Sequence, residues 1–237
     1  MKIQKTILLL LISIFILSCS SEEKMIHQTP SNTIRNRKIL TLGDSYTIGQ
    51  SVCETCKFPE QLKDSLLANL PDSYRISLQV IAQTGWTTTN LIAAINSQNP
   101  TSDFDLVTLL IGVNNQYQNK PFSLYETEFP QLVTKSISFA KGNKSKVIVV
   151  SIPDYAYTPF GLGSSNAQNI STQIDQYNLF AKNYCETNNI AFINITDITR
   201  LGLQQTNLVA SDGLHPSQIA YSKFVERILP LALEKIE

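Results

Sequence analysis

The chain has 237 residues, of which 43% are hydrophobic and 16% are charged. This length and composition predict a globular protein with one sizeable domain and exclude a largely disordered chain. Basic and acidic residues number 19 each, and no basic run stands out, which excludes the charge pattern of a nucleic-acid-binding protein. Only two histidines occur, His27 and His215, so chemistry that needs an imidazole has few candidates.

Residues 1–18 have the pattern of a secretory signal. Lys2 and Lys5 precede an apolar run over 7–17, which is shorter than the ~20 residues that a membrane span needs. The sequence Ile-Leu-Ser-Cys over 16–19 resembles a bacterial lipobox, which implies lipidation of Cys19. Alternatively, Cys19 is an incidental residue behind an ordinary signal. We expect an exported bacterial lipoprotein that faces the periplasm or lies on the outer membrane or cell surface, held to the membrane by this lipid.

Residues 19–37 are expected to form the lipidated cysteine and a flexible tether. The segment is polar, contains Pro30 and shows no sustained period. His27 lies within it and is interpreted as a solvated linker residue. The folded domain is therefore expected over 38–237.

Short apolar segments with strand character follow at intervals. Residues 75–82 alternate apolar and polar side chains, which indicates an edge strand with one solvated face. The aliphatic runs over 106–111 and 147–152 are nearly continuous, which is typical of parallel strands buried on both faces. The two other predicted strands are 39–42 and 191–195.

Helical periodicity of about 3.6 residues separates these strands, with apolar stripes over 62–70, 129–140 and 174–185. The last stripe places Cys185 in the core. A final helix is expected from about Ser217 to Leu229, where Pro230 should interrupt it. The alternation predicts an α/β fold, a three-layer α/β/α sandwich around a mostly parallel sheet. Ligands of such sheets bind beyond the carboxyl ends of the strands.

Polar residues at these predicted strand ends can supply an acyl-transfer site. Ser45 offers a hydroxyl, which becomes a good nucleophile when a base removes its proton. His215 can be that base, and Asp212 can hold its ring in the required tautomer. Candidate donors to the oxyanion are the backbone N–H groups of Ser45 and Gly85 and the side-chain amide of Asn114. The segments concerned are 43–45, 84–86, 112–115 and 212–215.

Each of these assignments has a plainer alternative. Asp212 can cap the last helix as a turn residue, Gly85 can simply form a tight turn, and Asn114 can simply cap a loop. Asp154, at the end of the fourth predicted strand, is a second candidate for the acid.

These segments resemble the SGNH (GDSL-type) hydrolase family, whose four namesake residues match Ser45, Gly85, Asn114 and His215 in order. The resemblance covers about 38–229. It implies a flavodoxin-like, five-stranded sheet of order 2-1-3-4-5 and hydrolysis of an ester, with a lipid, an aryl or alkyl ester or an acetylated sugar as the substrate. The family's third motif usually ends in aspartate, whereas Asn115 stands here, so a substrate contact is expected to differ.

Five residues near the strand ends are candidate substrate contacts. The aromatic ones can line an acyl pocket or belong to ordinary packing. No metal or cofactor is expected. The candidates are Trp86, Asn115, Tyr117, Asp154 and Tyr155.

Cys53 and Cys56 are close enough in sequence to form a small disulfide loop in an oxidising compartment, stabilising the fold by roughly 2 kcal/mol. A redox centre would need a strand before the pair and a helix after it, and zinc would need further ligands. A structural disulfide beside the site is the prediction.

Two other functions remain open. The chain can be a non-catalytic surface lipoprotein that binds glycan or lipid in the same cleft. It can also be a flavodoxin-like binder of flavin or phosphate, although residues 43–49 offer little of the Gly/Ser/Thr-rich loop that this requires.

Overall fold

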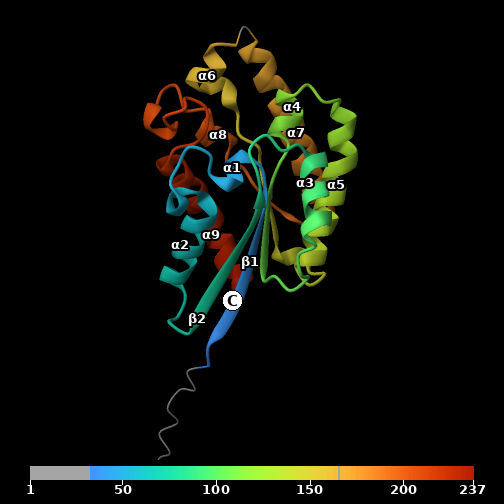
Figure 1. The fold of residues 1–237 in the computed structure, drawn as a ribbon, viewed down its shortest axis with the longest axis vertical. Coiled ribbons are helices and arrows are strands. Elements are labelled where there is room, and N and C mark those ends of the chain that lie inside the picture. Colours follow the sequence, from blue (N-terminus) through green and yellow to red (C-terminus); the bar gives the residue numbers. More distant parts are fainter. Residues whose placement is uncertain (1–32, 165) are drawn as a thin grey trace, which may run out of the picture. The chain divides into compact units, whose positions relative to one another are not determined.

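A computed structural model describes residues 33–164 and 166–237. The predicted signal, Cys19, His27 and most of the predicted tether lie outside the described residues. Within them, a single sheet lies between two layers of helices (Figure 1). None of the helices in this part of the chain combines the length and the apolar character needed to cross a bilayer.

The sheet has five parallel strands in the order β2-β1-β3-β4-β5, which confirms the predicted fold. β1 lies between β2 and β3, and its register with β2 runs without a break from Arg35 beside Tyr74 to Gly43 beside Ala82. The strands are β1 (Arg35–Gly43), β2 (Tyr74–Ala82), β3 (Leu106–Leu110), β4 (Val147–Val150) and β5 (Ala191–Ile193).

Two groups of helices cover the two faces of the sheet. α2 and α9 pack together on one face, and α3, α5 and α7 pack on the other (Figure 1). Short helices follow several strand ends. The helices are α1 (Ser45–Ile48), α2 (Phe58–Asn69), α3 (Thr88–Gln98), α4 (Val113–Tyr117), α5 (Phe122–Phe139), α6 (Pro159–Leu162), α7 (Ala167–Asn188), α8 (Thr196–Thr199) and α9 (Gln218–Ile236).

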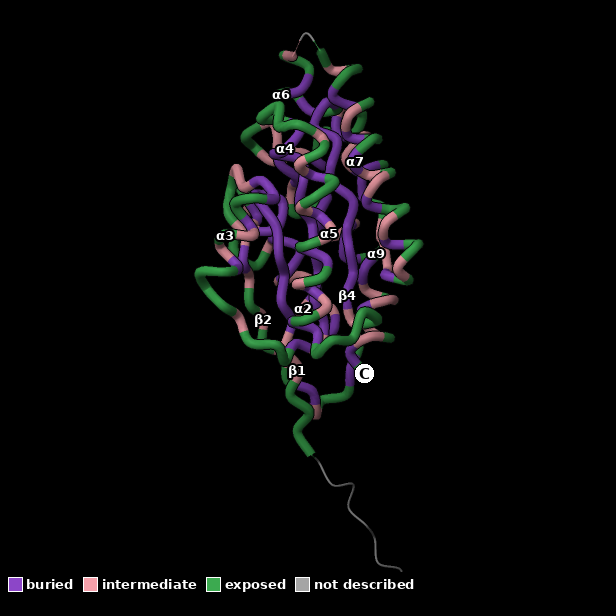
Figure 2. The backbone as a smooth tube through the Cα atoms, turned by 90° about the vertical axis from the view of Figure 1, so that its right-hand side faces the viewer, coloured by how far each residue is buried: buried purple, intermediate pink, exposed green. Residues whose placement is uncertain are grey.

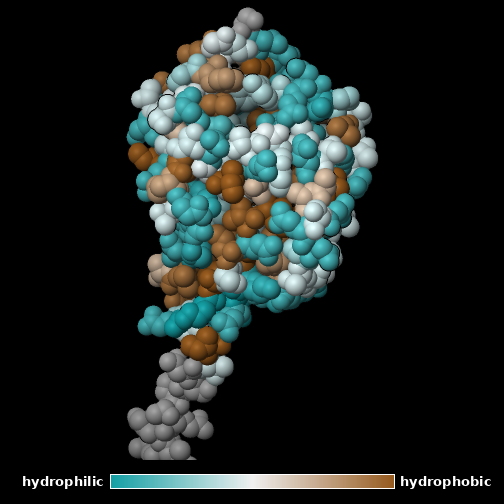
Figure 3. Space-filling view, viewed as in Figure 1, coloured by the Kyte–Doolittle hydropathy of each residue, from teal (hydrophilic) through white to brown (hydrophobic). Residues whose placement is uncertain are grey.

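The central strands are buried on both faces, as their aliphatic runs predict. Every residue of β3 and β4 is buried, and so are the last five residues of β1 (Figure 2). β2 and β5 are the two edge strands, and the residues of both are mostly only partly buried or exposed. Apolar surface gathers over the middle of the molecular face on which β2 is seen (Figure 3). The sheet therefore has partly solvated edges and a dry centre.

The strand boundaries differ from the predicted ones by a few residues. β1 begins at Arg35, within the segment that was expected to be tether, because its first residues pair with β2 although they are exposed. β5 ends at Ile193, and Ile195 instead precedes α8. Apolar character alone does not distinguish a strand from the buried turn that follows it.

The prediction that α9 stops at Pro230 is wrong. The helix continues to Ile236 because Ile228, Ala232 and Ile236 carry one buried stripe past the proline, which itself is exposed. Packing against α2 thus outweighs the ~3 kcal/mol that an interior proline costs. At the end of the helix, Arg37 donates to the backbone carbonyls of Ile236 (2.6 Å) and Glu237 (3.0 Å).

Gly43 ends β1 where the chain turns directly into α1. A Cβ atom at this position would overlap the Thr47 hydroxyl and the carbonyl oxygen of Leu110. The short turn places Ser45 at the first position of α1, with Asp44 as its N-cap. A glycine is needed here for space.

We expect Gly43→Ala to destabilise the fold by about 2–3 kcal/mol, because both neighbours belong to closely packed elements. Gly142→Ala is the matched control. Gly142 has a φ of 74°, and a Cβ atom there would meet open space, so strain alone should cost about 1 kcal/mol. Urea unfolding of both variants measures the difference, and equal losses would contradict the steric argument.

Candidate active site

The predicted site residues come together beyond the carboxyl ends of β1, β2 and β3. Gly85, Asn114 and His215 line one cavity of about 200 Å³. Tyr46, the residue after Ser45, lines it too, whereas Ser45 is 3% exposed beside it. Segments that are far apart in the sequence thus meet at one edge of the sheet, as the parallel topology requires.

Asp212 and His215 form a close pair within one turn. Asp212 Oδ2 lies 2.6 Å from His215 Nδ1, and Oδ1 accepts the backbone N–H groups of Leu214 (2.9 Å) and His215 (3.0 Å). Gly213, with a φ of 73°, allows the chain to bend between them. Because Nδ1 is bound to the carboxylate, Nε2 is the ring nitrogen left for chemistry in the cavity.

Ser51 is a third partner of this carboxylate. Its hydroxyl donates to Asp212 Oδ2 at 2.6 Å, so one oxygen serves both the ring and the serine. Burial raises the pKa of Asp212, but the hydrogen bonds from Ser51, His215 and the backbone outweigh it and hold the pKa well below its usual range. Asp212 is therefore ionised at neutral pH.

Ser45 and His215 do not share a hydrogen bond in the described residues, although the sequence led us to expect one. The two segments instead meet through the Tyr46 ring, whose centre lies 5.2 Å from that of His215 at an angle of 51°. Catalytic hydrogen bonds of this kind are often long in an unliganded site and shorten when a substrate binds.

The loop that carries Gly85 is held on both sides. Gln118 Nε2 donates to the Gly85 carbonyl oxygen at 2.8 Å, and Thr84 Oγ1 donates to Gln50 Oε1 at 2.6 Å. Gly85 itself has a φ of 83°, which an L side chain adopts only with strain. These contacts orient the loop at the rim of the cavity.

Asn114 and Asp44 carry buried polar atoms that complete no hydrogen bond of normal geometry, namely Asn114 Nδ2 and Asp44 Oδ2. A buried donor without a partner is costly, so it usually serves a function. Asn114 lines the cavity, while its Nδ2 atom is buried on the side of Asp44.

Asp44 is fully buried beneath Ser45. Burial raises the pKa of Asp44 to about 7, although hydrogen bonding to the Tyr46 N–H and the nearby Asn114 amide oppose the rise. The two aspartates of the site thus differ strongly, since one stays ionised and the other binds a proton near neutral pH.

The five predicted substrate contacts divide into two groups. Tyr117 and Tyr155 line the cavity. Trp86 instead packs against the core. Asn115 is fully buried and bound to Thr88, so the expectation that it contacts a substrate is wrong.

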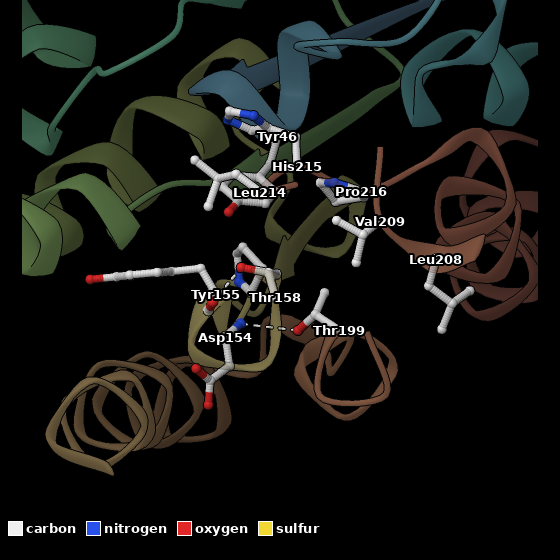
Figure 4. Close-up of a pocket in the computed structure, with 11 residues that line it drawn as sticks. Tyr46, Asp154, Tyr155, Thr158, Thr199, Leu208, Val209, Leu214, His215 and Pro216 are labelled. Carbon is white, nitrogen blue, oxygen red and sulfur yellow. Dashed lines mark hydrogen bonds between the residues drawn. The ribbon is translucent and has the colours of Figure 1, made fainter. Parts of the chain in front are cut away.

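Asp154 does not line this cavity, although it lines a smaller pocket beside it that also includes His215 and is drawn in Figure 4. Its carboxylate accepts Ser171 Oγ (2.7 Å) and Arg200 Nε (2.9 Å), and it points away from His215 (Figure 4). It therefore fits neither the role of a substrate contact nor that of the second candidate acid. Both Asn115 and Asp154 were candidates for their position at strand ends, which does not fix the direction of a side chain.

Cys53 and Cys56 are joined in a disulfide beside the site. The loop that it closes lies between Ser51 and α2. Lys57 follows this loop, forms an ion pair with Glu54 at 2.5 Å and packs against Gly49.

Ser51, which donates to Asp212, is the site residue that the sequence analysis missed. Its backbone is left-handed, with a φ of 66°. A sequence usually indicates this conformation by an asparagine or a glycine, so a serine gives no sign of it.

Comparison with known proteins agrees with the fold. Residues 41–223 match the model of the GDSL-like lipase/acylhydrolase family. A search of curated proteins finds no match.

Solved structures share the fold at low identity. A lipase/acylhydrolase from Enterococcus faecalis is 19% identical, with 85% of this chain and 97% of that chain covered and a TM-score of 0.64. An acetyl xylan esterase from Geobacillus stearothermophilus is also 19% identical, with 85% and 96% covered and a TM-score of 0.62. A member of the lipolytic G-D-S-L family from Veillonella parvula is 20% identical, with 82% and 97% covered and a TM-score of 0.60.

We expect Asp44→Asn to flatten the dependence of stability on pH. The pKa of Asp44 is raised on folding, so the native state holds a proton that the unfolded state releases, and stability falls as pH rises from about 4 to 7. Asparagine keeps the acceptor for the Tyr46 N–H and has no such proton. Urea unfolding at pH 5 and pH 8 should show that the free energy of unfolding falls less between these two pH values in the variant than in the unaltered protein. An identical pH dependence of the two proteins would contradict the raised pKa.

We expect Ser51→Ala to raise the pKa of Asp212, because the carboxylate loses a donor that favours its charged form. Since the folded-state value lies below the unfolded one, this group stabilises the fold above about pH 4 and ceases to do so as pH falls. Carboxyl ¹³C NMR titration measures the shift. Ser51→Gly also removes the hydroxyl, and glycine tolerates a φ of 66°, so it should raise the pKa of Asp212 by the same amount. If only the alanine variant raises this pKa, the cause is a change of the backbone and not the lost hydrogen bond.

Proposed function

Since this chain belongs to the GDSL-like lipase/acylhydrolase family, we propose that it hydrolyses carboxylic esters through an acyl-enzyme on Ser45. The observation that carries the proposal is the Asp212–His215 pair at 2.6 Å on the rim of a cavity that Asn114 also lines. An ionised carboxylate behind an imidazole is the arrangement that lets a neighbouring hydroxyl act as a nucleophile.

The first step forms the acyl-enzyme. Ser45 Oγ attacks the carbonyl carbon of the ester while His215 Nε2 takes its proton, and Asp212 stabilises the charged ring. His215 then passes the proton to the oxygen of the departing alcohol. In the second step water attacks the acyl carbon while His215 takes one of its protons. The bond between the acyl carbon and Ser45 Oγ then breaks, the carboxylic acid leaves, and His215 gives that proton to Ser45 Oγ.

The charge that develops on the carbonyl oxygen needs donors in place beforehand. Asn114 Nδ2 completes no hydrogen bond of normal geometry, although it lies close enough to Asp44 to lower the pKa of that carboxyl, and it is the strongest candidate. The backbone N–H groups of Ser45 and Gly85 complete the proposed set, and the bonds from Gln118 and Thr84 support the position of the Gly85 loop. Loss of one such donor typically slows an enzyme by about 10²–10³-fold.

We also propose that the protein is an exported lipoprotein anchored through Cys19. The support for this is the lipobox-like sequence over 16–19 and the disulfide between Cys53 and Cys56, a bond that persists in oxidising compartments. Metabolic labelling with a fatty-acid analogue, which Cys19→Ser should abolish, addresses the anchor separately from the catalytic activity.

Labelling with a fluorophosphonate tests the function directly. The unaltered protein should be labelled and should hydrolyse p-nitrophenyl acetate, and Ser45→Ala should abolish both. Asp212→Asn should slow both by about 10²–10⁴-fold without abolishing them, because the hydroxyl and the base remain but the ring loses its orientation.

Ser97→Ala is the matched control, since Ser97 is exposed on α3 and lies outside the lining of this cavity, and it should be labelled normally. If the folded, unaltered protein is neither labelled nor turns over any ester, the enzyme proposal fails. The chain would then be a binding module on the same fold.

A further inference from the structure

We infer that a groove lined by residues of α4, α6 and α7 binds the alcohol part of the ester, and that this alcohol is an uncharged, polyhydroxylated one such as an oligosaccharide. The inference rests on the proposed function, which places the ester carbonyl in the neighbouring cavity. The groove measures about 520 Å³. α4 and α6, which supply part of its lining, lie near the same end of the domain as the site (Figures 1 and 2).

The groove and the cavity share one wall. Tyr117, Tyr155 and Phe160 line both. Their rings pack together, with centres 5.8 Å apart for Tyr117 and Tyr155 and 6.1 Å apart for Tyr117 and Phe160. A molecule whose acyl group lies in the cavity can therefore extend across these rings into the groove.

Side-chain amides supply the polar part of the groove. Gln116 Nε2 donates to Gln173 Oε1 at 2.8 Å, and Gln116 Oε1 accepts the Tyr155 hydroxyl at 2.8 Å. The Nε2 group of Gln173 and the side chains of Asn119 and Asn169, all in the lining, donate to no group in the described part of the chain. An amide offers both donors and acceptors, which is what a row of hydroxyl groups requires.

Charge distinguishes this alcohol from other leaving groups. Among the described residues, neither the lining of the groove nor that of the cavity includes aspartate, glutamate, lysine or arginine. A phosphate group would lose its hydration there without gaining an opposite charge. The composition therefore favours a neutral alcohol over the head group of a phospholipid.

The exposed rings suit the same ligand. Tyr117 is 52% exposed and Phe160 is 43% exposed, which is unusual for large aromatic side chains that also contact each other. The C–H face of a sugar ring can pack on such a surface while its hydroxyl groups reach the amides. The cavity beyond, with Val113 and Leu214 in its wall, is mostly apolar and suits the acyl group.

Three acetate esters that differ only in the alcohol test the inference. We expect the catalytic efficiency for an acetylated xylo-oligosaccharide to fall by about 5–10-fold in Gln173→Leu, which corresponds to one lost hydrogen bond. The efficiency for p-nitrophenyl acetate should stay within about twofold, because this small ester does not reach the groove. 1-Acetylglycerol 3-phosphate, whose alcohol carries a phosphate, should be a poor substrate of every variant.

Gln176→Leu is the matched control. It makes the same change on the same helix three residues away, and Gln176 lies outside the lining of the groove. It should leave all three rates unchanged. An equal fall for the oligosaccharide ester and for p-nitrophenyl acetate in Gln173→Leu would overturn the inference, and so would no fall at all or a preference for the ester that carries a phosphate.

Binding to a variant that lacks the nucleophile gives a second readout. Ser45→Ala should bind the acetylated oligosaccharide in calorimetry, and Ser45→Ala combined with Gln173→Leu should bind it more weakly by about the same factor as the loss in efficiency. If the unaltered protein hydrolyses p-nitrophenyl acetate but Ser45→Ala binds no oligosaccharide, the groove inference fails and the proposed function stands. If it hydrolyses no ester, the proposed function fails, and the inference with it.

Discussion

The carboxylate of Asp212 is the group on which the geometry of the site depends. Its two oxygens accept the Ser51 hydroxyl, two backbone N–H groups of its own turn and the ring of His215. A carboxylate with this many donors stays ionised and does not rotate freely. The turn before α9 is thereby held in the shape that brings the imidazole over the end of β1, where α1 begins.

The two aspartates of the site show how one fold gives the same side chain opposite properties. Asp44 is fully buried and receives few donors, so its proton is held up to about pH 7, while Asp212 is surrounded by donors and holds none. The hydrogen bond of the His215 ring goes to Asp212, so the charged carboxylate of the pair is the one that orients the imidazole.

The sequence alone predicted the sheet well, because the aliphatic runs of β3 and β4 have few other interpretations. It also identified the segments at the strand ends, since a parallel sheet brings such ends together. The sequence could not predict the role of residues for which the direction of the side chain decides the contacts. Asn115 and Asp154 follow strands as expected but turn inward to Thr88 and Arg200. Pro230 was misjudged because local propensity says nothing of the packing against α2.

The bonds from Arg37 to the carbonyl groups of Ile236, which ends α9, and of Glu237, which follows it, have a practical consequence. They join the beginning of β1 and the end of the helix at the amino edge of the sheet, whereas the cavity opens at the carboxyl edge. Both ends of the domain therefore lie on the side away from the chemistry (Figure 1). A reporter protein or a surface-immobilisation tag fused at either end should leave the approach of large polymers to the cavity unobstructed.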